Sequence, residues 1–249
     1  MPRPKSPAQR VASVAVGFCY GQSTVTPQWR RAYQFVILRD AATQRRIVGE
    51  FAHEVSGAHV PTARSKIVRE FLAHPAKPDW LWIVDTDATF ADDVLERLIA
   101  AADPVERPIV GGLAFGVRQT KDVNGHEILN EVGAGSLELF PTIYLATDDG
   151  TVPLVEYPPD QLVRCHATGA HCLLVHRSVL ADPRWFEDGH PDPWFRIAVR
   201  HGQIVSEDQF FCLRAGSYGY PIHVDTAIKT GHVKTFIADE SLYRAQVPS

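Results

Sequence analysis

The sequence lacks several features that mark other classes of protein. It has no apolar run long enough to cross a membrane, and no apolar region follows residues 1–10 that would complete a signal peptide. Its 25 Lys and Arg residues do not outnumber its 29 Asp and Glu residues, so the net charge of −4 gives no general attraction for nucleic acid or anionic lipid. We therefore expect a soluble, cytoplasmic protein that binds any polyanion through a local site.

Cysteine is also scarce, and repeats and low-complexity tracts are absent. The four cysteines form no Cys-x-x-Cys pair and lie in apolar segments, which favours buried free thiols over disulfides or zinc ligands: Cys19, Cys165, Cys172 and Cys212. With 249 residues and 45% hydrophobic content, the chain is long enough to bury the core of one continuous domain. We expect this domain over residues 11–235, after a disordered segment 1–10 and before a tail, 236–249.

Strand and helix patterns alternate in the first half of the chain. Strands are expected at Val11–Phe18, 46–55, Leu81–Val84 and Ile109–Leu113, and helices at Trp29–Arg39, from Pro61 to about Leu72, and at Asp92–Ala101. This alternation predicts a mostly parallel sheet with helices on both faces.

The second half changes character. Thr142–Leu145 and Val152–Val155 flank Thr147–Gly150 and predict an antiparallel hairpin. A Pro- and Trp-rich loop over residues 182–195 is a candidate lid. Ser206 with Glu207 and Asp208 predicts a helix start, and Tyr220–Asp225 a last strand.

The most informative segment is the apolar run Leu81–Val84, which ends in Asp85 and Asp87. Such a run fits a strand covered on both faces, and ligands of open α/β sheets bind at the carboxyl ends of such strands. Two carboxylates this close repel each other unless a cation joins them, and hard oxygen ligands suit Mg²⁺ or Mn²⁺. The alternative is that they only cap the following helix.

A series of motifs extends this interpretation over residues 11–235. The order of the motifs resembles the GT-A class of glycosyltransferases, especially small bacterial and phage-encoded members related to glycosyltransferase family two. The resemblance depends on Ala63-Arg64-Ser65-Lys66, Asp85-Thr86-Asp87, Gly111-Gly112, Thr168-Gly169-Ala170, Pro193-Trp194-Phe195, Glu207-Asp208, Gly219-Tyr220-Pro221 and Gly231-His232.

The resemblance implies an α/β fold of GT-A type, with a mixed, mostly parallel central sheet flanked by helices and an antiparallel hairpin region on the acceptor side. Residues 11–116 would form the nucleotide-binding half and residues 117–235 the acceptor-side half. The implied reaction moves a sugar from a nucleotide-diphosphate sugar, with uridine diphosphate as the expected carrier, to a hydroxyl group. The acceptor stays open between a glycan, a protein side chain, a lipid-linked sugar and a modified DNA base, in a bacterial or phage-infected cell.

The resemblance also assigns roles to residues. Asp87 would bind Mn²⁺ or Mg²⁺, His232 would complete the metal site, and Asp85 would face the ribose or the metal. Ser65 stands where the family often has Asn. The nucleotide-sugar site is expected to comprise Arg64, Asp85, Asp87, Gly111, Gly112, Thr168, Gly169 and Trp194.

For an inverting reaction a carboxylate must accept the proton of the acceptor hydroxyl. Asp208 is the family-matched candidate and Glu207 the second choice. Structural roles are the alternatives: helix-start charges for these two acids, an ordinary histidine for His232, a core residue for Trp194 and a bulge for Gly111 and Gly112.

Three rival functions fit parts of the sequence. A haloacid-dehalogenase-like phosphatase would use Asp85 as nucleophile and Asp87 as acid/base, but the motif follows two strand-helix units instead of opening the chain. A nucleotidyltransferase would carry a Gly-rich loop with a basic residue, which residues 17–26 lack. A non-catalytic carbohydrate- or nucleic-acid-binding module would not need both aspartates and His232.

Overall fold

The structure is a computed structural model that describes residues 11–21, 25–55, 59–119, 137–148, 150–200 and 202–234. The predictions for residues 1–10 and 236–249 lie outside the described residues. None of the described helices combines the length and the apolar character needed to cross a bilayer.

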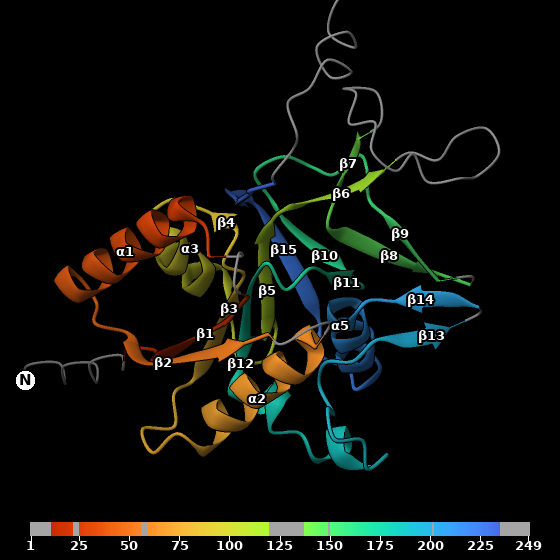
Figure 1. Cartoon of the computed structure of the whole chain (residues 1–249), viewed down its shortest axis with the longest axis horizontal. Coiled ribbons are helices and arrows are strands. Elements are labelled where there is room, and N and C mark those ends of the chain that lie inside the picture. Colours follow the sequence, from red (N-terminus) through yellow and green to blue (C-terminus); the bar gives the residue numbers. More distant parts are fainter. Residues whose placement is uncertain are drawn as a thin grey trace, which may run out of the picture.

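A seven-stranded sheet forms the centre of the molecule, in the order β10-β15-β5-β12-β3-β1-β2 (Figure 1). Five strands run in one direction, and β12 and β10 run in the other. The predicted mixed, mostly parallel sheet is therefore confirmed. Its strands are β1 (Val14–Tyr20), β2 (Ile47–Glu54), β3 (Trp80–Val84), β5 (Ile109–Leu113), β10 (Leu162–Cys165), β12 (Cys172–His176) and β15 (Ile222–Lys229).

Strand β12 lies between β3 and β5 and is antiparallel to both. Its first residue, Cys172, pairs with Val84, the last residue of β3. Because the two strands run in opposite directions, the residue before β12 lies beside the residues that follow β3. This register brings segments about 85 positions apart in the chain to the same edge of the sheet.

Helices cover both faces of the sheet and create two apolar cores. Side chains alternate along β3: Trp82 packs with α1 (Pro27–Ala42) and α3 (Val94–Ala101), whereas Leu81 and Ile83 pack with α2 (Val60–Ala73) and α5 (Glu207–Ser217). The strand is apolar at every position because both of its faces are buried. Helix α1 begins where the Thr26 hydroxyl accepts a hydrogen bond from the Trp29 amide, with Pro27 in the first turn.

Smaller sheets and short helices complete the fold. The predicted hairpin is confirmed by the antiparallel pair β8–β9, to which β11 adds a third strand. The remaining elements are β4 (Ala88–Thr89), β6 (Phe115–Gln119), β7 (Leu137–Pro141), β8 (Ile143–Thr147), β9 (Gly150–Pro153), β11 (Ala167–Thr168), α4 (Arg177–Leu180), η1 (Pro183–Phe186), β13 (Ala198–Arg200), β14 (Gln203–Val205) and β16 (Gly231–His232).

Aromatic side chains near the two ends of segment 182–195 lie in the core, so those residues do not form a lid, and a lid from the exposed residues 186–191 stays a prediction. The Trp185 ring stacks on Phe211 of α5 at 5.5 Å between centroids, and its indole N–H donates to the Val179 carbonyl at 2.7 Å. Phe195 stacks on the same Phe211 at 4.8 Å. Side chains buried this completely anchor the segment against α5, because releasing them would expose large apolar surfaces.

Candidate functional site

The two aspartates of the sequence motif lie at the carboxyl end of β3. Several hydrogen bonds hold the turn. Among them, the Asp85 amide donates to the His171 carbonyl (3.0 Å), the Ala88 amide to the Asp85 carbonyl (3.1 Å), and the Thr86 hydroxyl to the Cys19 carbonyl (3.1 Å). A cavity of about 460 Å³ opens at this turn. Its lining residues are Cys19, Gly21, Val55, Val60, Arg64, Asp85, Thr86, Asp87 and Glu207.

Arg64 of α2 is buried in the wall of the cavity and bridges two carboxylates. Its Nη2 donates to Asp85 Oδ1 and its Nη1 to Glu207 Oε1, each at 2.6 Å. Burial acts to raise the pKa of Asp85, but Arg64 and His171 together outweigh it and hold that pKa below its usual range. Burial raises the pKa of Glu207 against the opposing charge of Arg64. The bridge thus fixes the end of β3 to α2 and α5.

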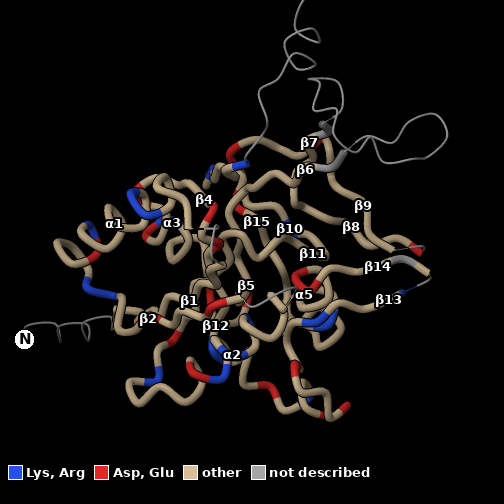
Figure 2. Tube along the Cα trace, viewed as in Figure 1, with Lys and Arg blue, Asp and Glu red and all other residues tan. Residues whose placement is uncertain are grey.

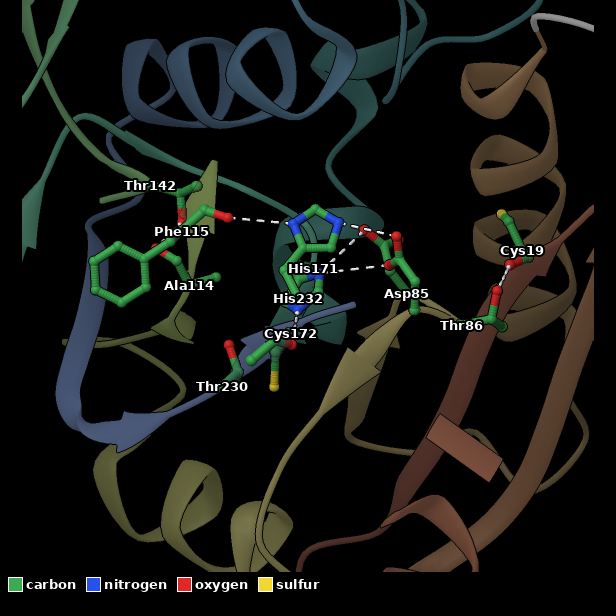
Figure 3. A network of polar contacts seen from close by, with 12 residues as sticks. Cys19, Asp85, Thr86, Ala114, Phe115, Thr142, His171, Cys172, Thr230 and His232 are labelled. Atoms are coloured by element: carbon green, nitrogen blue, oxygen red, sulfur yellow. Dashed lines mark hydrogen bonds and ion pairs between the residues drawn. The ribbon is translucent and has the colours of Figure 1, made fainter. Parts of the chain in front are cut away.

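Asp87 meets two histidines from distant parts of the chain. Its Oδ2 lies 2.9 Å from His232 Nε2, and its Oδ1 lies 3.9 Å from His171 Nδ1. His232 reaches this position because β16 pairs with β4, which follows Asp87 directly. The two imidazole rings lie side by side, with centroids 4.6 Å apart (Figure 3). Lys234 Nζ is 3.5 Å from Asp87 Oδ2.

These three residues fit a divalent metal ion. One ligand atom from each of Asp87, His171 and His232 lies within 4.8 Å of the others. A carboxylate with two imidazoles is a common donor set for divalent transition metals. The buried Nδ1 of His171 has no hydrogen-bond partner among the residues that the structure describes, and a ligand would satisfy it. Burial opposes ionisation of Asp87, but the hydrogen bond and charge of His232 together with the charge of Lys234 outweigh it and lower the pKa of Asp87.

The two candidate bases stand at the start of α5. Glu207 is held by Arg64, whereas Asp208 Oδ1 accepts from the Ser206 hydroxyl and from the Gln209 amide at 2.8 Å. Asp208 Oδ2 faces Gly169, where an added Cβ would lie 3.5 Å from it. The predicted helix start is confirmed, although the Ser206 side chain bonds Asp208 instead of capping the helix backbone.

Four of the residues expected at the nucleotide-sugar site have packing contacts in the structure, and their role at that site stays a prediction. An added Cβ at Gly111 would lie 3.3 Å from Thr168, and one at Gly112 would lie 3.2 Å from Ile228, so both glycines let side chains cross β5 closely. Thr168 is fully buried. Trp194 is 1% exposed and donates its indole N–H to the Leu180 carbonyl at 2.9 Å. None of the four appears among the described residues that line the cavity.

Five of the other predicted residues come together, and two further residues join them, whereas Asp208 and Gly169 face each other and do not line the cavity. Arg64, Asp85, Asp87 and Glu207 line the cavity, and His232 contacts Asp87. Asp85 is also expected as a metal ligand, but its Oδ1 accepts a hydrogen bond from Arg64. Arg64 therefore competes with a metal ion for this oxygen. Sequence reasoning missed His171 and Lys234. The sequence does contain a sign of the role of His171, because this residue directly precedes an apolar strand just as Asp85 directly follows one.

Comparison with known proteins identifies the fold. No protein-family model matches the chain, and no curated protein matches it. Among solved structures, GalNAc-T7 with UDP, GalNAc and Mn²⁺ is similar over 91% of this chain and 44% of its own, with a TM-score of 0.55 and 14% identity. A197 from STIV is similar over 90% of this chain and 86% of its own, with a TM-score of 0.53 and 13% identity. The chain therefore has the GT-A fold, and it spans less than half of the GalNAc-T7 chain.

Proposed function

We propose that the protein is a metal-dependent glycosyltransferase that moves a sugar from a nucleotide-diphosphate sugar, with uridine diphosphate as carrier, to a hydroxyl acceptor. The observation that carries this proposal is the meeting of Asp87 and His232, 2.9 Å apart, beside a cavity of about 460 Å³ at the carboxyl end of β3. Fold likeness to a structure that holds UDP and Mn²⁺ supports the choice of donor and metal.

Asp87 and His232 would hold Mn²⁺ or Mg²⁺, which when bound neutralises the charge of a departing diphosphate. Arg64 does not serve as a free cation, because both of its terminal nitrogens are paired with carboxylates. Its role is to position Asp85 for contact with the ribose. Lys234, whose Nζ is 3.5 Å from Asp87 Oδ2, offers an amine close to the expected diphosphate.

Asp208 is the proposed base for an inverting transfer. Glu207 is a weaker candidate because its carboxylate is bound to Arg64. Gly169 carries no side chain over Asp208 Oδ2, so an acceptor hydroxyl can approach this oxygen. Residues 11–116 would thus supply most of the donor site, and the half from residue 117 to residue 235 would add His232 and Lys234 to it and supply the base and the acceptor side.

The acceptor class stays open between a glycan, a protein side chain, a lipid-linked sugar and a modified DNA base. Figure 2 shows Lys and Arg spread over several elements instead of gathered along one groove. This distribution gives no support to tight sequence-independent binding of nucleic acid, which depends on clustered positive charge.

Calorimetric titration with nucleoside diphosphates tests the proposal. The protein is titrated with UDP, GDP and ADP in the presence of Mn²⁺, Mg²⁺ or a chelator. We expect metal-dependent binding of UDP, lost in Asp87→Ala and kept in the control Asp92→Ala, which removes an exposed carboxylate that pairs with Arg39. Absence of nucleotide binding under every metal condition would refute the proposal.

The phosphatase alternative has less structural support. A nucleophilic Asp85 needs a carboxylate oxygen directed at the substrate phosphorus, and Arg64 already binds Asp85 Oδ1 at 2.6 Å. Hydrolysis of a phosphate monoester by the wild type, lost in Asp85→Asn, would favour that function instead.

A further inference from the structure

We infer that His171 is the third protein ligand of the metal and that it makes the site select Mn²⁺ over Mg²⁺. The inference depends on the proposed function in one respect, which is that a divalent metal binds at Asp87 and His232. It adds a ligand from the residue directly before β12, which the Asp-x-Asp motif does not contain.

The position of His171 is fixed by the fold. It precedes β12, its carbonyl accepts a hydrogen bond from the Asp85 amide at 3.0 Å, and the residue is 5% exposed. Its Nδ1 points at both carboxylates, 3.6 Å from Asp85 Oδ2 and 3.9 Å from Asp87 Oδ1. These separations exceed hydrogen-bond distance, so within the described part of the chain this buried nitrogen has no hydrogen-bond partner, although both carboxylates lie within ion-pair distance of it. An unsatisfied buried nitrogen is costly and calls for a ligand.

The hydrogen bonds of the two rings determine which nitrogen is available on each. His171 Nε2 lies 3.0 Å from the Gly231 carbonyl, and His232 Nδ1 lies 3.2 Å from the Phe115 carbonyl (Figure 3). A carbonyl only accepts, so these two nitrogens carry the protons and donate. Imidazole metal ligands characteristically donate their other N–H in this way. The remaining nitrogens, Nδ1 of His171 and Nε2 of His232, face Asp87. His232 Nε2 lies 2.9 Å from Asp87 Oδ2 and donates to it, so a metal bound between them would take the place of this proton.

The third donor is therefore a nitrogen in place of the second carboxylate of the motif. Asp85 is drawn away by Arg64, which binds its Oδ1 at 2.6 Å. Mg²⁺ prefers oxygen ligands, whereas imidazole nitrogens suit first-row transition ions. With two nitrogens and one carboxylate, the site should bind Mn²⁺ more tightly than Mg²⁺.

Pulsed electron paramagnetic resonance of the protein loaded with Mn²⁺ alone tests the inference. We expect hyperfine coupling from two directly bound imidazole nitrogens in the wild type and from one in His171→Leu. A single nitrogen in the wild type would overturn the inference while leaving the site at Asp87 and His232 intact. Failure of the wild type to bind Mn²⁺ would instead remove the metal site and the inference together.

The ratio of Mn²⁺ to Mg²⁺ affinity gives a second measurement. This ratio would not change if His171 only stabilised the fold. In His171→Leu we expect Mn²⁺ affinity to fall about 100-fold and the preference for Mn²⁺ over Mg²⁺ to fall with it. His171→Asp, which supplies an oxygen, should shift the preference toward Mg²⁺ even if the leucine variant does not fold. The control His166→Leu changes an exposed histidine five positions earlier and should leave both affinities unchanged. An equal loss of affinity for both metals in His171→Leu would overturn the inference.

Discussion

Replacing Arg64 by methionine is expected to destabilise the protein by about 3 kcal/mol at pH 7, because it leaves two carboxylates without their cation. Removal of one partner from a buried ion pair costs about 3–5 kcal/mol. The Arg64 side chain is 5% exposed, but those of Asp85 and Glu207 are 30% and 18% exposed, which places the expected cost at the lower end. For a chain of this size, the midpoint of thermal unfolding should fall by about 6–12 °C.

The loss in Arg64→Met should depend on pH. In the wild type the pKa of Asp85 lies below its usual value, so this stabilisation is present above the unfolded pKa of 3.8 and is lost as pH falls through the lowered folded value. Without Arg64, both carboxylates become easier to protonate, and protonation relieves their burial. The difference in unfolding free energy between wild type and variant should therefore shrink between pH 7 and pH 4.

Urea unfolding followed by circular dichroism at several pH values measures this effect. Lys66→Met serves as a control, since it removes the same charge from an exposed position of α2 and should change stability by less than about 0.5 kcal/mol. The triple variant Arg64→Met, Asp85→Asn, Glu207→Gln should regain most of the lost stability. A difference below about 1 kcal/mol at pH 7, or one that does not change with pH, would refute the reasoning.

Two packing predictions follow from close contacts. Gly17→Ala places a Cβ 2.4 Å from Ile67 Cγ2 and should cost about 1–3 kcal/mol in urea unfolding, whereas Gly216→Ala, with 3.6 Å of clearance in α5, should be neutral or stabilising. Trp194→Ala should cost about 3–5 kcal/mol while the folded fraction binds nucleotide with unchanged affinity. If calorimetry shows that fully folded Trp194→Ala protein no longer binds nucleotide, Trp194 is part of the nucleotide-sugar site.

Local patterns in the sequence were enough to predict most of the individual elements. The run Leu81–Val84 had to be a strand buried on both faces, because every position is apolar and the run is too short for a helix. The hairpin followed from turn residues between two β-rich segments. The spacing of Asp85 and Asp87 after the strand predicted a polar site at its carboxyl end, and both residues do line the cavity.

Long-range pairing decided which distant residues join that site. Local sequence does not reveal that β12 inserts antiparallel between β3 and β5, and this pairing alone brings His171 beside Asp85 and Asp87. Local sequence also does not reveal whether an aromatic side chain packs in the core or lines a pocket. The motif places Trp194 at the nucleotide-sugar site, whereas in the structure its side chain lies in the core. The sequence by itself determined the strands, the helices and the carboxylates that end β3, because these depend on neighbouring residues. Only the tertiary structure decided the partners of those carboxylates, because strand order and register depend on burying both faces of the whole sheet.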